Sequence, residues 1–117
     1  MASLNWIKIY DFKMHGPEPQ QRGSVRVINI DEKRVCLAYT DKGYFAVNNR
    51  CPHAGAWLGE GWCEGNQVVC PVHRWKYDLE TGRGAPGQGD YVDTYPIRQT
   101  EEGVFIGLKK DPWWKIW

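Results

Sequence analysis

Two short segments, each with one cysteine and one histidine, constrain this sequence more than any other feature. The first reads Cys51-Pro52-His53, and after sixteen residues the second reads Cys70-Pro71-Val72-His73. The sixteen residues between them include four glycines and are expected to form loop, except for a short strand at Val68-Val69 that leads into Cys70. Two loops of this kind can face each other and place two thiolates and two imidazoles around one metal centre.

The spacing of these four residues narrows the type of centre. A zinc finger usually takes two cysteines from one segment and two histidines from another. Here each segment is mixed, and the first has a single residue between its candidate ligands. The pattern favours a cluster in which Cys51 and Cys70 bind one iron, His53 and His73 bind a second, and two sulfides bridge the irons. A structural zinc site with the same ligands is the alternative.

The motif and the residues after it resemble the Rieske iron–sulfur proteins. Cys-Pro-His, sixteen residues and Cys-Pro-Val-His are followed by Arg-Trp-Lys-Tyr-Asp at 74–78. The resemblance implies one [2Fe–2S] cluster with Cys51, His53, Cys70 and His73 as its ligands. It extends over most of the chain and therefore concerns the fold as well as the site.

The remainder of the sequence predicts an all-β protein. Thirteen glycines and seven prolines favour short strands over long helices. Alternating apolar residues mark strands at 4–12 and 25–30, and apolar runs mark hairpins over 35–47 and 92–108. We expect small antiparallel sheets packed as a sandwich or partial barrel. The tail 111–117, with three tryptophans, is expected to pack back on these sheets, and the alternative is a surface for a partner or for self-association.

The chain is expected to form a single domain over residues 1–117, and the resemblance implies that this domain consists of two subdomains. Rieske domains have a β base into which a smaller cluster-binding subdomain is inserted. We place the cluster-binding subdomain at 48–86 and the base at 1–47 and 87–117.

Length and charge exclude several classes of function. A chain of 117 residues forms one domain of ordinary size. Its net charge of +1 offers no basic surface for nucleic acid and no polybasic patch for a membrane. It has no apolar stretch long enough to span a bilayer and no signal-peptide pattern at its start, so we expect a cytoplasmic protein.

Within the family, the sequence is similar to the ferredoxins of oxygenase systems rather than to the respiratory proteins. The respiratory proteins carry an extra cysteine near each ligand loop, joined as a disulfide, where this chain has Ala56 and Val72. Their serine hydrogen-bond donor is replaced by Trp75, whereas their tyrosine donor is matched by Tyr77. Pro86 matches a loop that covers the cluster. We therefore expect three residues to lie around the cluster without binding its irons: Trp75, Tyr77 and Pro86.

Two further cysteines, Cys36 and Cys63, remain. Cys36 lies in an apolar run and is expected to be a buried, inert thiol. Cys63 can be a fifth ligand or the partner of Cys36 in a disulfide, but a cytosolic compartment disfavours the disulfide. We treat both as structural.

The resemblance implies that the protein carries single electrons from a flavin-containing reductase to a terminal oxygenase, with docking near His53 and His73. The chain has three histidines, and His15 alone cannot supply the two-histidine iron site of Rieske oxygenases, so we expect no catalytic site of its own. One alternative is the small subunit of an assimilatory nitrite reductase, whose partner is the large subunit. A structural zinc-binding module is an alternative of another class.

We predict a midpoint potential toward the low end of the Rieske range, which is roughly −150 to +300 mV. Hydrogen bonds to the cluster's sulfurs stabilise the reduced state, and the serine donor and the disulfide of the respiratory proteins are both missing. A redox titration of the purified protein measures this value. A midpoint well above zero would contradict the prediction.

Overall fold

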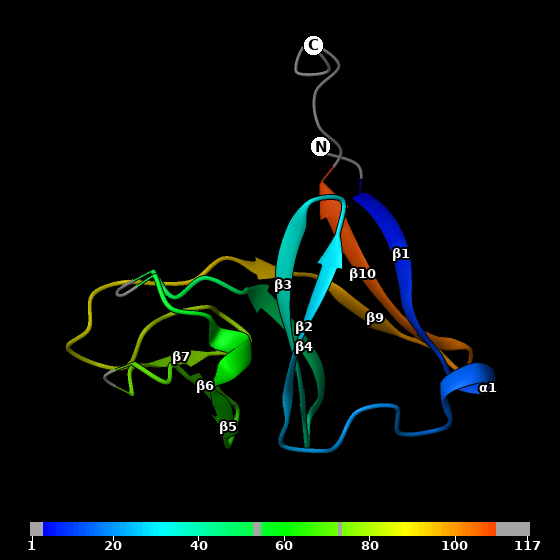
Figure 1. Ribbon diagram of the computed structural model, residues 1–117, viewed down its shortest axis with the longest axis horizontal. Coiled ribbons are helices and arrows are strands. Elements are labelled where there is room, and N and C mark those ends of the chain that lie inside the picture. The colour runs from blue at the N-terminus through cyan, green and yellow to red at the C-terminus, as the bar shows by residue number, and fades with distance from the viewer. Residues whose placement is uncertain (1–3, 53–54, 73, 110–117) are drawn as a thin grey trace, which may run out of the picture.

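The structure is a computed structural model that describes residues 4–52, 55–72 and 74–109. These residues form three antiparallel sheets and two short helical segments (Figure 1). The predictions for His53, His73 and the tail 111–117 lie outside the described residues. Within the described ranges, none of the helices has the length and apolar character needed to cross a membrane.

The first sheet joins the two ends of the described chain. Its strand order is β1 (Leu4–Asp11), β10 (Gly103–Lys109) and β9 (Ile97–Gln99). β1 and β10 pair over almost their whole length, from Leu4 opposite Lys109 to Asp11 opposite Gly103. The N-terminal strand is thereby fixed in a sheet made otherwise of the last two strands.

The second sheet contains β2 (Val25–Ile30), β3 (Lys33–Thr40), β4 (Gly43–Asn48) and β8 (Thr94–Tyr95), in that order. β2, β3 and β4 are consecutive hairpin strands. They are rich in valine, isoleucine and tyrosine, which favour extended backbone. The end of β4 leads directly to Cys51.

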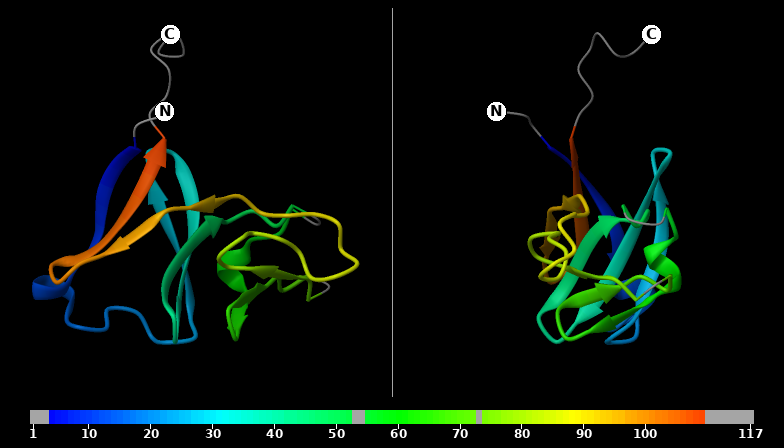
Figure 2. Two further views of the ribbon diagram at one scale, coloured as in Figure 1. Left: turned by 180° about the vertical axis from the view of Figure 1, so that it is seen from behind. Right: turned by 90° about the vertical axis from the view of Figure 1, so that its left-hand side faces the viewer.

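The third sheet is smaller and lies beside the second. It consists of β5 (Trp62–Glu64), β6 (Gln67–Val69) and β7 (Lys76–Asp78). Figures 1 and 2 show the second sheet lying between the first and third sheets. All three strands of the third sheet come from residues between Cys51 and Leu79.

The two helical segments are short. α1 (Phe12–His15) is capped at its N-terminus by the side chain of Asp11, which accepts a hydrogen bond from the Lys13 N–H at 2.9 Å. The Asp11 N–H in turn donates to Nδ1 of His15 at 3.0 Å. η1 (Leu58–Glu60) is a single 3-10 turn. It follows the first ligand segment, the name used here for Cys51-Pro52-His53, and the second ligand segment is Cys70-Pro71-Val72-His73.

Strand β3 is buried on both faces, which explains its nearly continuous apolar sequence. Val35, Leu37 and Tyr39 face the first sheet, whereas Cys36 and Ala38 face the third sheet. The core toward the first sheet also contains Tyr10, Tyr44, Ala46, Val104, Ile106 and Leu108. The core toward the third sheet also contains Val47, Cys51, Leu58, Val68, Cys70, Tyr77, Leu79 and Val92.

The prediction of an all-β protein of small antiparallel sheets is confirmed. The hairpin predicted over 35–47 is also present, as β3 and β4. The prediction of loop between the two Cys–His segments was wrong for η1 and β5, whereas the short strand predicted at Val68-Val69 is confirmed as part of β6. The glycines of this stretch end elements rather than preventing them: Gly61 follows η1, and Gly65 has a φ of +58° in the turn between β5 and β6.

We predict that Leu58→Ala lowers the free energy of unfolding by about 2–5 kcal/mol, because it leaves a cavity where a fully buried side chain joins η1 to the core. Urea denaturation followed by circular dichroism measures the change. Met14→Ala, at a side chain that is 79% exposed, is the matched control and should have little effect. A loss below about 1 kcal/mol for Leu58→Ala would contradict the packing described above.

Candidate metal centre

The first ligand segment is a compact loop that follows β4. The Cys51 N–H donates to the carbonyl of Ala56 at 2.7 Å, and the Gly55 N–H donates back to the Cys51 carbonyl at 2.8 Å. Arg50 and Trp57 form a β-bridge across the base of the loop. These bonds fix the backbone of Cys51.

The second ligand segment is closed in the same way. The Cys70 N–H donates to the carbonyl of Trp75 at 2.8 Å, so each cysteine bonds a carbonyl five residues further on. Arg74 has a φ of +56°, a left-handed conformation that is uncommon outside glycine. The backbone N–H of Val72 donates a hydrogen bond to the Cys70 sulfur, and this bond acts to lower the pKa of that thiol.

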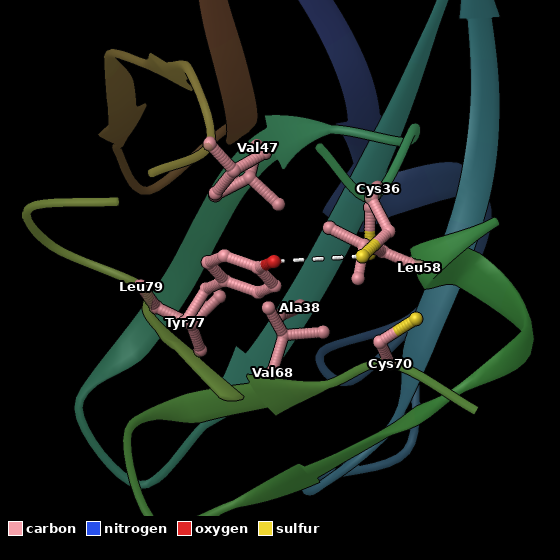
Figure 3. Packing of buried hydrophobic residues seen from close by; sticks show 10 residues of the cluster. Cys36, Ala38, Val47, Leu58, Val68, Cys70, Tyr77 and Leu79 are labelled. Carbon is pink, nitrogen blue, oxygen red and sulfur yellow. Dashed lines mark hydrogen bonds between the residues drawn. The ribbon is translucent and has the colours of Figure 1, made fainter. Parts of the chain in front are cut away.

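These two loops bring Cys51 and Cys70 together inside the core. Both side chains are fully buried, in the same cluster as Leu58, Val68 and Tyr77. Figure 3 labels Cys70 with these three residues. Burial raises the pKa of the Cys70 thiol to about 11, and the neighbouring Cys51 thiol adds to this effect. The structure therefore places two cysteine sulfurs from separate loops side by side in an apolar pocket.

Tyr77 lies against these sulfurs. Its side chain is fully buried, and its hydroxyl is 3.5 Å from the Cys51 Sγ, as the dashed line in Figure 3 marks. The same hydroxyl is 3.0 Å from Oδ2 of Asp90. Burial raises the pKa of Tyr77 well above its usual value, so the hydroxyl keeps its proton. The sequence offered no signal for Asp90, which lies thirteen residues from Tyr77 in a glycine-rich loop.

A third loop is attached to the start of β7, just after the second ligand segment. The Gln88 N–H donates to the Ala85 carbonyl at 3.0 Å, which forms a turn with Pro86 at its second position and Gly87 at φ +92°. The Gln88 side chain also bonds both the N–H and the carbonyl of Lys76, each at 3.0 Å. Pro86 is therefore an exposed turn residue on a loop fixed to the site.

Comparison with known proteins identifies the family. Residues 13–96 match the Rieske [2Fe-2S] domain. The ferredoxin component of the naphthalene 1,2-dioxygenase system of Pseudomonas aeruginosa is 31% identical over 88 residues, which are 74% of this chain and 84% of that protein. The chain belongs to the Rieske [2Fe-2S] domain family.

Solved structures agree with this Rieske fold. A complex of reduced oxygenase and oxidized ferredoxin in carbazole 1,9a-dioxygenase contains a chain with a TM-score of 0.73 at 20% identity, covering 86% of this chain and 99% of that one. A protein from Mycobacterium tuberculosis described as an NADH-dependent nitrite reductase small subunit gives 0.77 at 22% identity, with 92% and 98% covered.

The described part of the pocket suits a Rieske cluster. Two bare thiolates would be costly in an apolar pocket, and nearby iron offsets their charge. Two ferric ions, two sulfides and two thiolates sum to zero charge, which a buried site tolerates. The cluster would add the ability to accept one electron, while this chain holds and shields it. Within the described residues, which exclude His53 and His73, no three His, Cys, Asp or Glu side chains gather as a metal site.

The other two cysteines have structural surroundings. Cys36 is fully buried on β3, and burial raises the pKa of its thiol to about 12, with a smaller effect from the nearby Cys63. Burial raises the pKa of Cys63 to about 11, and its Sγ donates to the Ser24 carbonyl at 3.8 Å. Neither forms a disulfide.

We predict that Cys36 and Cys63 resist alkylation in the native protein. At pH 8 fewer than about one in a thousand of these thiols is ionised, and the thiolate is the reactive form. Mass spectrometry after iodoacetamide treatment should find neither labelled until guanidinium unfolds the chain. A label on native Cys36 would contradict its burial. Failure of both to label in unreduced, unfolded protein would reveal a disulfide.

Proposed function

We propose that this protein is a one-electron carrier whose [2Fe–2S] cluster is held by Cys51, His53, Cys70 and His73. The observation that carries the proposal is the pairing of the buried Cys51 and Cys70 side chains from two similarly closed loops. The relative from Pseudomonas aeruginosa is a ferredoxin component, and the chain covers most of it. A component of that kind transfers electrons and leaves the chemistry on the substrate to another protein.

The ligand assignment is tested with cysteine variants. Cys51→Ala and Cys70→Ala should each lose the bound iron and sulfide, because each removes a ligand from the same iron. Cys63→Ala is the matched control, since its half-buried thiol lies outside the proposed ligand set. Iron and acid-labile sulfide analysis gives the result. Full iron content in Cys51→Ala or Cys70→Ala would remove that residue from the ligand set.

The proposed subdomains follow the sheets. The sheet of β5, β6 and β7 is built entirely from residues within 48–86, which we propose as the cluster-binding subdomain. The strands of the other two sheets come from 4–48 and 94–109, almost entirely within the proposed base. The base would then hold the two ligand loops at its edge.

The proposed partners are a flavin-containing reductase as electron donor and a terminal oxygenase as acceptor. The carbazole 1,9a-dioxygenase complex contains both an oxygenase and a ferredoxin of this fold. Docking would use the surface around the ligand loops, near His53 and His73. Apolar Trp57 and Val72 are 40% and 39% exposed there, which suits a small, transient interface.

The charges of the ligand loops indicate the character of the partner surface. Arg50 and Arg74 are the charged residues of 48–58 and 70–75, and both are exposed. Arg34 lies over the Trp57 ring, with its guanidinium carbon 5.5 Å from the ring centroid. An acidic partner surface would complement these arginines, and its association would weaken as salt increases.

The small subunit of a nitrite reductase is the second candidate. The protein from Mycobacterium tuberculosis favours it, but identity of 22% supports only a shared fold. By family resemblance, members of that group often lack the iron ligands, whereas this sequence has all four. Copurification with a large sirohaem protein would support this candidate over an oxygenase ferredoxin.

An anaerobic reductive titration tests the electron-carrier function. We predict that dithionite reduces the purified protein with about one electron per chain, because a Rieske cluster takes up one electron. Adding oxidised cytochrome c should then restore the original spectrum. A protein that takes up no electrons and contains one zinc would be the structural module instead.

A further inference from the structure

The Tyr77 hydroxyl has one hydrogen and two neighbours that can accept it. Oδ2 of Asp90 is 3.0 Å away and the Cys51 Sγ is 3.5 Å away. An ionised carboxylate has no hydrogen to donate, so the contact with Asp90 requires Tyr77 to be the donor. Hydrogen bonds to a charged acceptor are also stronger than neutral ones. The geometry therefore directs the hydrogen toward Asp90 and leaves the hydroxyl oxygen facing the sulfur.

Asp90 is held where it can compete for this hydrogen. Its backbone carbonyl accepts from the Gly84 N–H at 2.9 Å, which fixes it beside the turn that carries Pro86. A Cβ built on Gly84 would lie 2.6 Å from Nε2 of Gln88 and 2.9 Å from both the backbone oxygen and Oδ1 of Asp90, so the loop packs closely around this glycine. Oδ1 is buried and has no hydrogen-bond partner within the described residues. Among the described residues, the Tyr77 hydroxyl thus donates a hydrogen bond to one oxygen of this carboxylate, and the other oxygen receives none.

We propose that Asp90 is a positioning residue that withholds the Tyr77 hydrogen from Cys51 and thereby lowers the midpoint potential of the cluster. This rests on the proposed function, because it assumes that Cys51 is a cluster ligand. A hydrogen bond donated to a ligand sulfur stabilises the more negative, reduced centre. When the hydrogen goes to Asp90 instead, the reduced state loses that stabilisation.

The charge of Asp90 provides a competing route to the same effect. A carboxylate near the cluster disfavours an added electron by direct repulsion, and Tyr77 plays no part in that route. The two routes differ in one respect. If Asp90 acts through Tyr77, removing the hydroxyl abolishes the effect of changing Asp90. If it acts by charge alone, the effect persists.

A double-mutant cycle on the cluster-loaded protein separates these routes. Redox titrations at pH 8 would compare wild type, Asp90→Asn, Tyr77→Phe and the double variant. We expect Asp90→Asn to raise the potential, so that the reduced-to-oxidised ratio at the wild-type midpoint increases about two- to tenfold, the worth of one hydrogen bond. In the Tyr77→Phe background, the same substitution should leave the potential unchanged.

Controls keep the outcome interpretable. Asp93→Asn, at an exposed carboxylate three residues away, should change the potential little. Asp90→Ala should shift the potential in the same direction as Asp90→Asn, and it replaces that variant if the latter folds poorly. An equal shift in both tyrosine backgrounds, or no shift in either Asp90 variant, would overturn the proposal. Failure of the proposed function would be distinct, because wild type itself would then contain no iron and sulfide.

Discussion

The burial of strand β3 on both faces is the constraint on which the rest of this structure depends. A single run of apolar residues from Val35 to Tyr39 supplies one side chain in turn to each of two cores. The core toward the first sheet joins the first and second sheets, and the core toward the third sheet contains Cys51 and Cys70. The packing of the first two sheets and the position of the candidate ligands are thereby coupled through one strand.

This coupling also sets the chemical environment of the site. The two thiols lie in the same apolar cluster as Leu58, Val68 and Tyr77, where an uncompensated charge is costly. A centre with little net charge suits such a pocket. The direction of one hydroxyl hydrogen then becomes influential, which is why the contact between Tyr77 and Asp90 matters more than an equivalent contact at the surface would.

Sequence reasoning predicted those features that have a local pattern. The strand β2 and the β3–β4 hairpin both follow from residue types at short spacing. It missed β5, whose three residues are stabilised by pairing with β6 rather than by their own propensity. It also missed Asp90, because the contact with Tyr77 depends on a loop folding back against β7. The ligand roles of Cys51, His53, Cys70 and His73 stay predictions from the motif.

The absorption and reduced-state electron paramagnetic resonance spectra of the purified protein, recorded together with iron and sulfide analysis, test the central claim most directly. The account predicts a red-brown protein with about two irons and two sulfides per chain, whose reduced state gives a signal averaging below the free-electron value. A colourless protein with one zinc and no signal after reduction would contradict it, and would make the four-ligand motif a structural site.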